Sequence, residues 1–218
     1  MKKFVSVIVA LLTMTNVVLA MSFSQPVEIG WIGMSQKGGG FSCKNESSNN
    51  GDYYTVYDKN NKNSYGKGVA KFGTGKDSLY VFYDVYKNKD IIRIGGQNSN
   101  NTVMLNILND WIYKIESDEG LTLYPIRFWY GPESDWRIVG YQKNGKFVKY
   151  VSTVDITEKY FGFDIHNGVS PVQYDVPICK GDTIIIKYRG HIKREVIGEF
   201  RFKWDDAAQW FSVEQVVY

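Results

Sequence analysis

The sequence predicts a mainly β protein: an antiparallel β-sandwich or small β-barrels, with at most one or two short helices. Short runs rich in Val, Ile, Tyr, Phe, Trp and Thr are separated by Asn, Asp, Gly and Lys, the composition of strands and turns. The runs recur about every 8–12 residues, a spacing typical of sandwiches and barrels. Long helical patterns do not alternate with these runs, so a doubly wound α/β fold is disfavoured.

Four single strands are expected in the first half of the chain. They cover residues 27–34, 53–57, 78–86 and 91–94. The segments 37–52 and 58–67 are rich in Gly, Asn, Ser and Lys, so we expect them to form surface loops.

Three hairpins are expected further along. The first joins residues 136–143 to 146–152 through Asn144-Gly145, a pair that favours a type I′ turn because both central residues need positive φ. The second joins residues 111–116 to 121–129 through residues 118–120. The third joins residues 183–189 to 195–204.

Two segments are ambiguous between helix and strand. Residues 103–115 carry apolar side chains at helical spacing, but they also contain Asn and Asp at positions that would lie inside the helix. We favour strands there. Residues 205–215 fit a short helix with Asp205 as its N-cap.

The start of the chain has the pattern of a signal peptide. Lys2 and Lys3 precede an apolar run, and Val18-x-Ala20 matches a signal-peptidase site, so residues 1–20 are expected to be removed on export. The product would be secreted, periplasmic or on the cell surface, and its formal charge would fall from +3 to +1. A near-neutral chain argues against nucleic-acid binding, which requires many phosphate contacts.

The remaining residues, 21–218, suit one domain or two small β subdomains, with a weak boundary near residues 157–167. No later stretch is long and apolar enough to form a transmembrane helix. Cys43 and Cys179 are the two cysteines, and in an exported protein this number predicts one disulfide between them, the alternative being two unpaired thiols.

Motifs for catalysis and cofactor binding are missing. Gly75-Lys76 lacks the partner glycine and the Ser or Thr of a phosphate-binding loop. The two histidines, His166 and His191, have no metal-ligand spacing. We therefore expect no cofactor and no metal, and name no catalytic residue. A carboxylate pair for glycan hydrolysis stays open as an alternative, because the chain has 23 acidic residues.

Two features suggest binding instead. Trp129, Tyr130 and Trp136 flank a Gly-Pro turn, where aromatic rings could stack on sugars, although core packing is the commoner role of such rings. The second feature is a strip of alternating residues in the third hairpin. Its candidate binding residues are Lys187, Arg189, Arg201 and Lys203.

From residue 187 to residue 203 there are six Lys or Arg and two Glu, a local charge of +4, which suits an anionic partner. The alternation also predicts that Phe200, Phe202 and Trp204 share the opposite, buried face, with the basic residues merely solvated.

These patterns favour an exported, non-enzymatic module that binds a glycan or another anionic polymer of the cell envelope. Two alternatives remain: an extracytoplasmic, carboxylate-dependent glycan hydrolase, and a small outer-membrane β-barrel, suggested by the terminal aromatic residue Tyr218.

Overall fold

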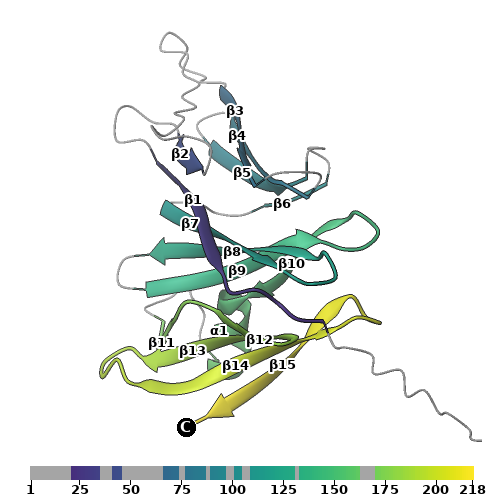
Figure 1. The fold of residues 1–218 in the computed structure, drawn as a ribbon. Coiled ribbons are helices and arrows are strands. Elements are labelled where there is room, and N and C mark those ends of the chain that lie inside the picture. The colour runs from purple at the N-terminus through teal and green to yellow at the C-terminus, as the bar shows by residue number, and fades with distance from the viewer. Residues whose placement is uncertain are drawn as a thin grey trace, which may run out of the picture.

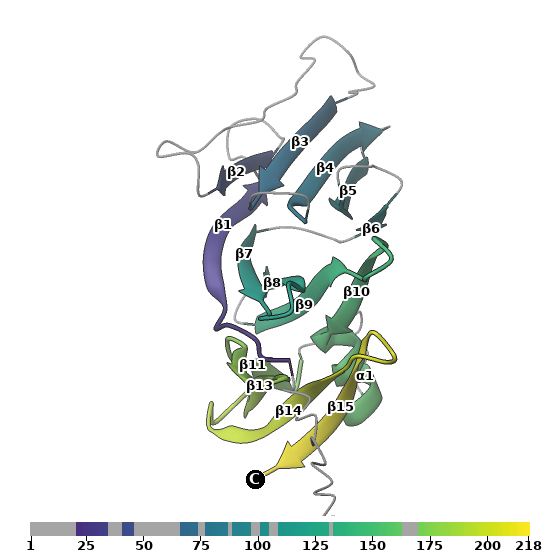
Figure 2. The same ribbon diagram turned by 45° about the vertical axis from the view of Figure 1, so that its right-hand side comes forward.

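The strands form three antiparallel sheets stacked as layers (Figures 1 and 2). The structure, a computed structural model, describes residues 21–34, 41–45, 66–73, 77–86, 89–96, 101–104, 109–130, 133–162 and 170–218. Every strand pairing in this part of the chain is antiparallel. The predicted mainly β, sandwich-like fold is confirmed.

The central sheet has the strand order β10-β9-β8-β7-β1-β2. Its members are β1 (Val27–Met34), β2 (Phe41–Asn45), β7 (Asn109–Glu116), β8 (Thr122–Tyr130), β9 (Glu133–Tyr141) and β10 (Phe147–Ser152). The four strands β7 to β10 follow one another as a meander, and β1 adds to the meander beside β7.

A sheet lies on each side of the central one. The four-stranded sheet comprises β3 (Gly66–Phe72), β4 (Leu79–Tyr86), β5 (Lys89–Gly95) and β6 (Thr102–Met104). The C-terminal sheet comprises β11 (Val172–Tyr174), β12 (Ile178–Lys180), β13 (Thr183–Gly190), β14 (Val196–Asp205) and β15 (Trp210–Val217). In the C-terminal sheet both β11 and β12 pair with β13.

The central sheet is buried on both faces. Leu123 and Ile138 pack in one cluster with the apolar side chains of the C-terminal sheet. Their neighbours Tyr124 and Val139 point the other way, into a second cluster with Leu79 and other residues of the four-stranded sheet. A strand covered on both faces is apolar at successive positions, which explains why β8 and β9 lack a clean alternation of polar and apolar residues.

Most expected strands and hairpins are confirmed. The strand at 27–34, those near 78–86 and 91–94, and all three hairpins are present. In the ambiguous stretch 103–115 the described residues are extended, as β6 and β7. The expected signal peptide, the strand at 53–57 and most of the loops at 37–52 and 58–67 lie outside the described residues.

The first hairpin has a different turn from the one predicted. Gly145 has φ 80° and its N–H donates to the carbonyl of Gln142 at 2.8 Å, but Asn144 is not among the described residues with positive φ. A type I′ turn requires positive φ at both positions, so that prediction is wrong. A single left-handed glycine closes the turn instead, as Gly120, with φ 83°, does in the second hairpin.

One helix, α1 (Thr153–Phe161), was not expected. Ser152 caps its N-terminus, accepting a hydrogen bond from the Asp155 N–H at 3.3 Å, and Gly162, in the left-handed conformation, ends it. Ile156 packs into the core between the central and C-terminal sheets. The boundary expected near 157–167 falls partly on this helix, and the core includes residues from both sides of it.

The helix expected at 205–215 is wrong, because β15 occupies most of that stretch. Asp205 does act as a cap, but its carboxylate accepts the N–H groups of Ala207 and Ala208 in a tight turn rather than in a helix. In the part of the chain that the structure describes, no helix is long and apolar enough to cross a membrane.

The predicted disulfide between Cys43 and Cys179 is also wrong. Cys179 lies in β12 as a free, buried cysteine, and burial raises the pKa of its thiol to about 12. Cys43 lies in β2, paired with Ile32 at the edge of the central sheet. β2 and β12 are at opposite ends of the stack (Figure 1), whereas a disulfide needs Cα atoms within about 7 Å.

Candidate functional site

A cleft opens where the tips of three hairpins meet. The β7–β8 and β9–β10 turns come from the central sheet and the β14–β15 turn from the C-terminal sheet, and all three tips lie on the same side of the stacked sheets (Figure 1). The cleft has a volume of about 470 Å³. Its lining residues are Met21, Asp77, Glu119, Gly120, Leu121, Thr122, Tyr141, Gln142, Lys143, Gly145, Trp204 and Gln209.

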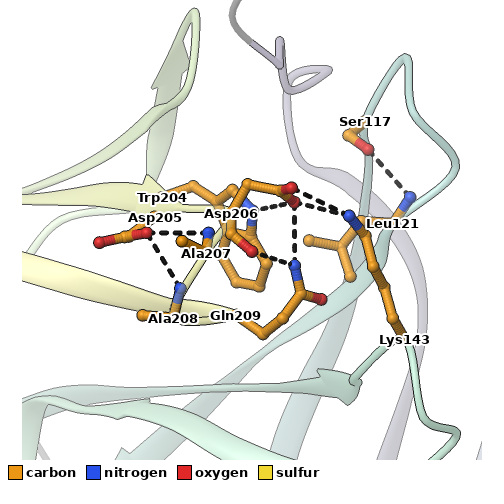
Figure 3. A network of polar contacts seen from close by, with 9 residues as sticks. All are labelled: Ser117, Leu121, Lys143, Trp204, Asp205, Asp206, Ala207, Ala208 and Gln209. Carbon is orange, nitrogen blue, oxygen red and sulfur yellow. Dashed lines mark hydrogen bonds and ion pairs between the residues drawn. The ribbon is translucent and has the colours of Figure 1, made fainter.

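Backbone hydrogen bonds fix the two turns of the central sheet. The Ser117 N–H donates to the carbonyl of Leu121 at 2.9 Å, and the Gln142 N–H donates to the carbonyl of Lys146 at 2.9 Å. The Ser117 hydroxyl also accepts the Leu121 N–H at 2.9 Å (Figure 3). Both turns therefore hold their side chains at defined positions on the rim of the cleft.

The β14–β15 turn is built around two carboxylates. Asp205 accepts two backbone N–H groups within the turn, at 2.9 and 3.0 Å. Gln209 donates its amide N–H groups to the carbonyl and the carboxylate of Asp206, at 2.7 and 2.9 Å (Figure 3). Gln209 has φ 52°, a left-handed conformation that non-glycine residues seldom adopt. The two hydrogen bonds to Asp206 therefore hold Gln209 in this unusual conformation within the β14–β15 turn.

An ion pair joins two of the layers at the rim. The Lys143 ammonium on the β9–β10 turn contacts both carboxylate oxygens of Asp206 on the β14–β15 turn, at 2.8 and 3.0 Å (Figure 3). The hydrogen bond from Lys143 lowers the pKa of Asp206, and that contact raises the pKa of Lys143. Both side chains are more than half exposed, so the pair positions the turns and adds little to stability.

Aromatic rings form the rigid part of the wall. The Tyr141 hydroxyl donates to the carbonyl of Ser78 at 2.9 Å, and its ring packs edge-on against Phe147 with centroids 5.0 Å apart. Burial, and to a lesser degree the charge of Asp77, raises the pKa of Tyr141 to about 12. Trp204 is held against Phe211, with ring centroids 5.0 Å apart. Neither ring can move without breaking core contacts.

Two carboxylates with shifted pKa values, those of Asp206 and Asp135, do not line the cleft. Asp206, with its lowered pKa, stays ionised near neutral pH and is unsuited to general acid catalysis. Asp135 has a pKa raised by burial, but it is 8% exposed, accepts a hydrogen bond from Thr153 at 2.8 Å and does not line the cleft. In the described part of the chain no three His, Cys, Asp or Glu residues come together as a metal site.

The aromatic residues proposed for binding do not form a site together. Trp136 is completely buried in the core between the central and C-terminal sheets, with its ring centroid 5.4 Å from that of Tyr113, so a sugar cannot reach it. Trp129 and Tyr130 lie at the end of β8, and their side chains are outside the described part of the structure.

The basic strip lies on the outer face of the C-terminal sheet, and its arginines are ion-paired. Phe200, Phe202 and Trp204 are buried on the inner face, as the alternation predicts. Arg189 forms a two-pronged ion pair with Asp175, at 2.7 and 2.8 Å. Its charge is thus largely neutralised by an acid that lies outside the strip in the sequence.

The other cations of the strip also face acids. Arg201 donates to Glu199 at 2.7 Å and lies 3.7 Å from Glu214. Lys203 is 3.8 Å from Asp182, and Lys187 lies opposite Glu199 in the register of β13 and β14. Although burial alone would raise the pKa of Glu199, hydrogen bonds from Tyr218 and Arg201 and nearby positive charges hold it below its usual value. The strip is therefore a network of opposite charges.

Comparison of the chain with protein-family models, with curated proteins and with solved structures finds no match in any of the three. The fold and the cleft define the protein only as a three-layer β-sandwich with a polar, aromatic-walled cleft on one side.

Proposed function

We propose that the protein is an exported, non-enzymatic binding module that takes a glycan in the cleft between its hairpin tips. The observation that carries this proposal is the lining of the cleft, which combines fixed aromatic rings with amide, ammonium and carboxylate groups. Its volume lies within the range of about 300–1,000 Å³ typical of small-ligand sites.

The chemistry of the lining suits a sugar. A sugar ring has apolar C–H faces and many hydroxyl groups, each of which both donates and accepts hydrogen bonds. Tyr141 offers a ring, and Gln142 offers a donor and an acceptor from the same amide. Glu119 accepts and Lys143 donates on the rim. The hydroxyl groups of a sugar would therefore pair with both the donors and the acceptors that line the cleft.

The basic strip supports the proposal less well. Its arginines and Lys203 are within 4 Å of acidic partners, so an anionic polymer would have to displace existing ion pairs. Exposed ion pairs are weak, about 0–1 kcal/mol each, but the acids remain in place and continue to repel an anionic ligand. The cleft is therefore the better candidate for the binding site.

A binding assay with purified residues 21–218 tests the proposal. The protein is mixed with insoluble peptidoglycan and with neutral and acidic polysaccharides, and released sugar is measured in the same tubes. We expect binding to at least one neutral glycan without release of sugar. Release would show a hydrolase instead, and absence of binding to every polymer would refute the proposal.

A matched pair of variants localises the binding. Gln142→Ala removes one amide from the cleft wall and leaves the backbone hydrogen bonds of the turn intact. We expect about a fivefold weaker affinity, since a hydrogen bond contributes about 1 kcal/mol. The control is Gln173→Ala on β11, which pairs with the end of β13 remote from the cleft. If both variants bind like the original protein, the ligand does not occupy the cleft.

A further inference from the structure

The rim of the cleft carries an excess of negative charge. The three turns at residues 117–121, 142–146 and 205–209 contain four acidic residues and two lysines. Asp77, which also lines the cleft, adds a fifth carboxylate. The formal charge of these three turns together with Asp77 is therefore −3, whereas the chain as a whole is positive.

The lysine of the lining is already engaged. Lys143 is held by both carboxylate oxygens of Asp206. Glu119 and Asp77 line the same cleft, and neither forms an ion pair with another described residue. The negative charge of Glu119 contributes to the raised pKa of Lys143, but less than the contacts with Asp206 do. A ligand that enters the cleft therefore meets two carboxylates that form no ion pair with another residue in the described part of the chain.

We infer that the cleft selects glycans by charge, binding amine-bearing sugars most tightly, neutral sugars less tightly and anionic sugars least. The inference rests on the proposed function and names the ligand class for the same site. The predicted ligand charge differs from the one that the basic strip suggested, because the strip favoured an anionic partner. Two unit charges about 7 Å apart in a water-like medium interact by about 0.6 kcal/mol. Two such carboxylates would therefore change affinity by about five- to tenfold for each charge on the ligand.

Three oligosaccharides of equal length test the inference: N-acetylglucosamine, glucosamine and galacturonic acid hexamers. Calorimetric titration is done at about pH 6, where an amine with a pKa near 8 is protonated. At low salt we expect the glucosamine hexamer to bind at least about five- to tenfold more tightly than the N-acetylglucosamine hexamer. The galacturonic acid hexamer should bind most weakly. High salt should shrink these differences, because it screens exposed charges.

A variant pair assigns the effect to the cleft. Glu119→Gln removes one charge from the lining, and we expect it to reduce the preference for glucosamine over N-acetylglucosamine about threefold. Glu158→Gln makes the same change on the exposed side of α1 and should leave the preference unaltered.

The outcomes separate the two claims. Binding of all three sugars with equal affinity, or tightest binding of galacturonic acid, would overturn the inference and leave the proposed glycan-binding function standing. An equal loss of preference in Glu119→Gln and Glu158→Gln would show that overall charge, not the cleft, selects the ligand. Failure of every oligosaccharide to bind would overturn the proposed function itself.

Discussion

Replacing Gly198 with alanine is expected to destabilise the protein by about 3 kcal/mol, near the upper end of the cost of overpacking a core. Gly198 in β14 lies directly opposite Tyr188 in β13. A Cβ at this position would overlap the Tyr188 ring and the carbonyl oxygen of Val216. The Tyr188 side chain cannot swing away, because it is fully buried and its ring packs at a tilt against Phe200, with centroids 5.1 Å apart.

Gly190→Ala provides the control. It changes another glycine of the same β13–β14 hairpin, but a Cβ there would meet only Ile197, at an ordinary distance of 3.9 Å. Urea unfolding followed by circular dichroism measures both variants. The packing described here requires a much lower midpoint for Gly198→Ala than for Gly190→Ala. Equal midpoints would mean that Tyr188 does not lie over Gly198.

Replacing Trp136 with alanine is expected to cost about 4 kcal/mol, as for other fully buried tryptophans. Trp136 belongs to the core between the central and C-terminal sheets, and none of its surface is exposed. The large cavity left behind cannot be filled, because neighbouring strands on both sides hold the backbone in place. The change should therefore lower the free energy of unfolding rather than act on ligand binding directly.

Trp210→Ala is the matched change at the edge of the C-terminal sheet, where Trp210 is 38% exposed and packs against Tyr150. We expect it to cost less than half as much. Thermal unfolding of the two variants gives the comparison. A Trp136→Ala variant as stable as the original protein would restore Trp136 as a candidate binding residue and contradict its place in the core.

The sequence predicts the hairpins well because their turns are local. Residues 118–120 and 144–145 carry the Asp, Asn and Gly that close tight turns, and the structure places turns at both. Helix α1 was missed because its Thr, Val, Ile and aromatic residues also suit a strand, and the preceding strand runs directly into it. The Asp205 cap was recognised, but a capping residue does not determine whether a helix or a turn follows.

The candidate site could not be predicted in the same way. The cleft brings together Asp77, Glu119, Lys143 and Gln209, which come from separate turns, and nothing in the sequence says which turns meet. The ion pairs of the basic strip could not be predicted from the sequence for a related reason. Counting charges along residues 187–203 cannot reveal acids such as Asp175, which lie outside that stretch and neutralise it in the folded sheet.

The central claim is that the ligand lies between the hairpin tips, and hydrogen exchange tests it most directly. Amide exchange of residues 21–218 is followed by mass spectrometry with and without saturating N-acetylglucosamine hexamer. Binding in the cleft predicts slower exchange in peptides that cover residues 117–122, 141–146 and 205–209, with no change in β11. Protection confined to residues 187–203, or no protection at the three turns, would contradict the claim.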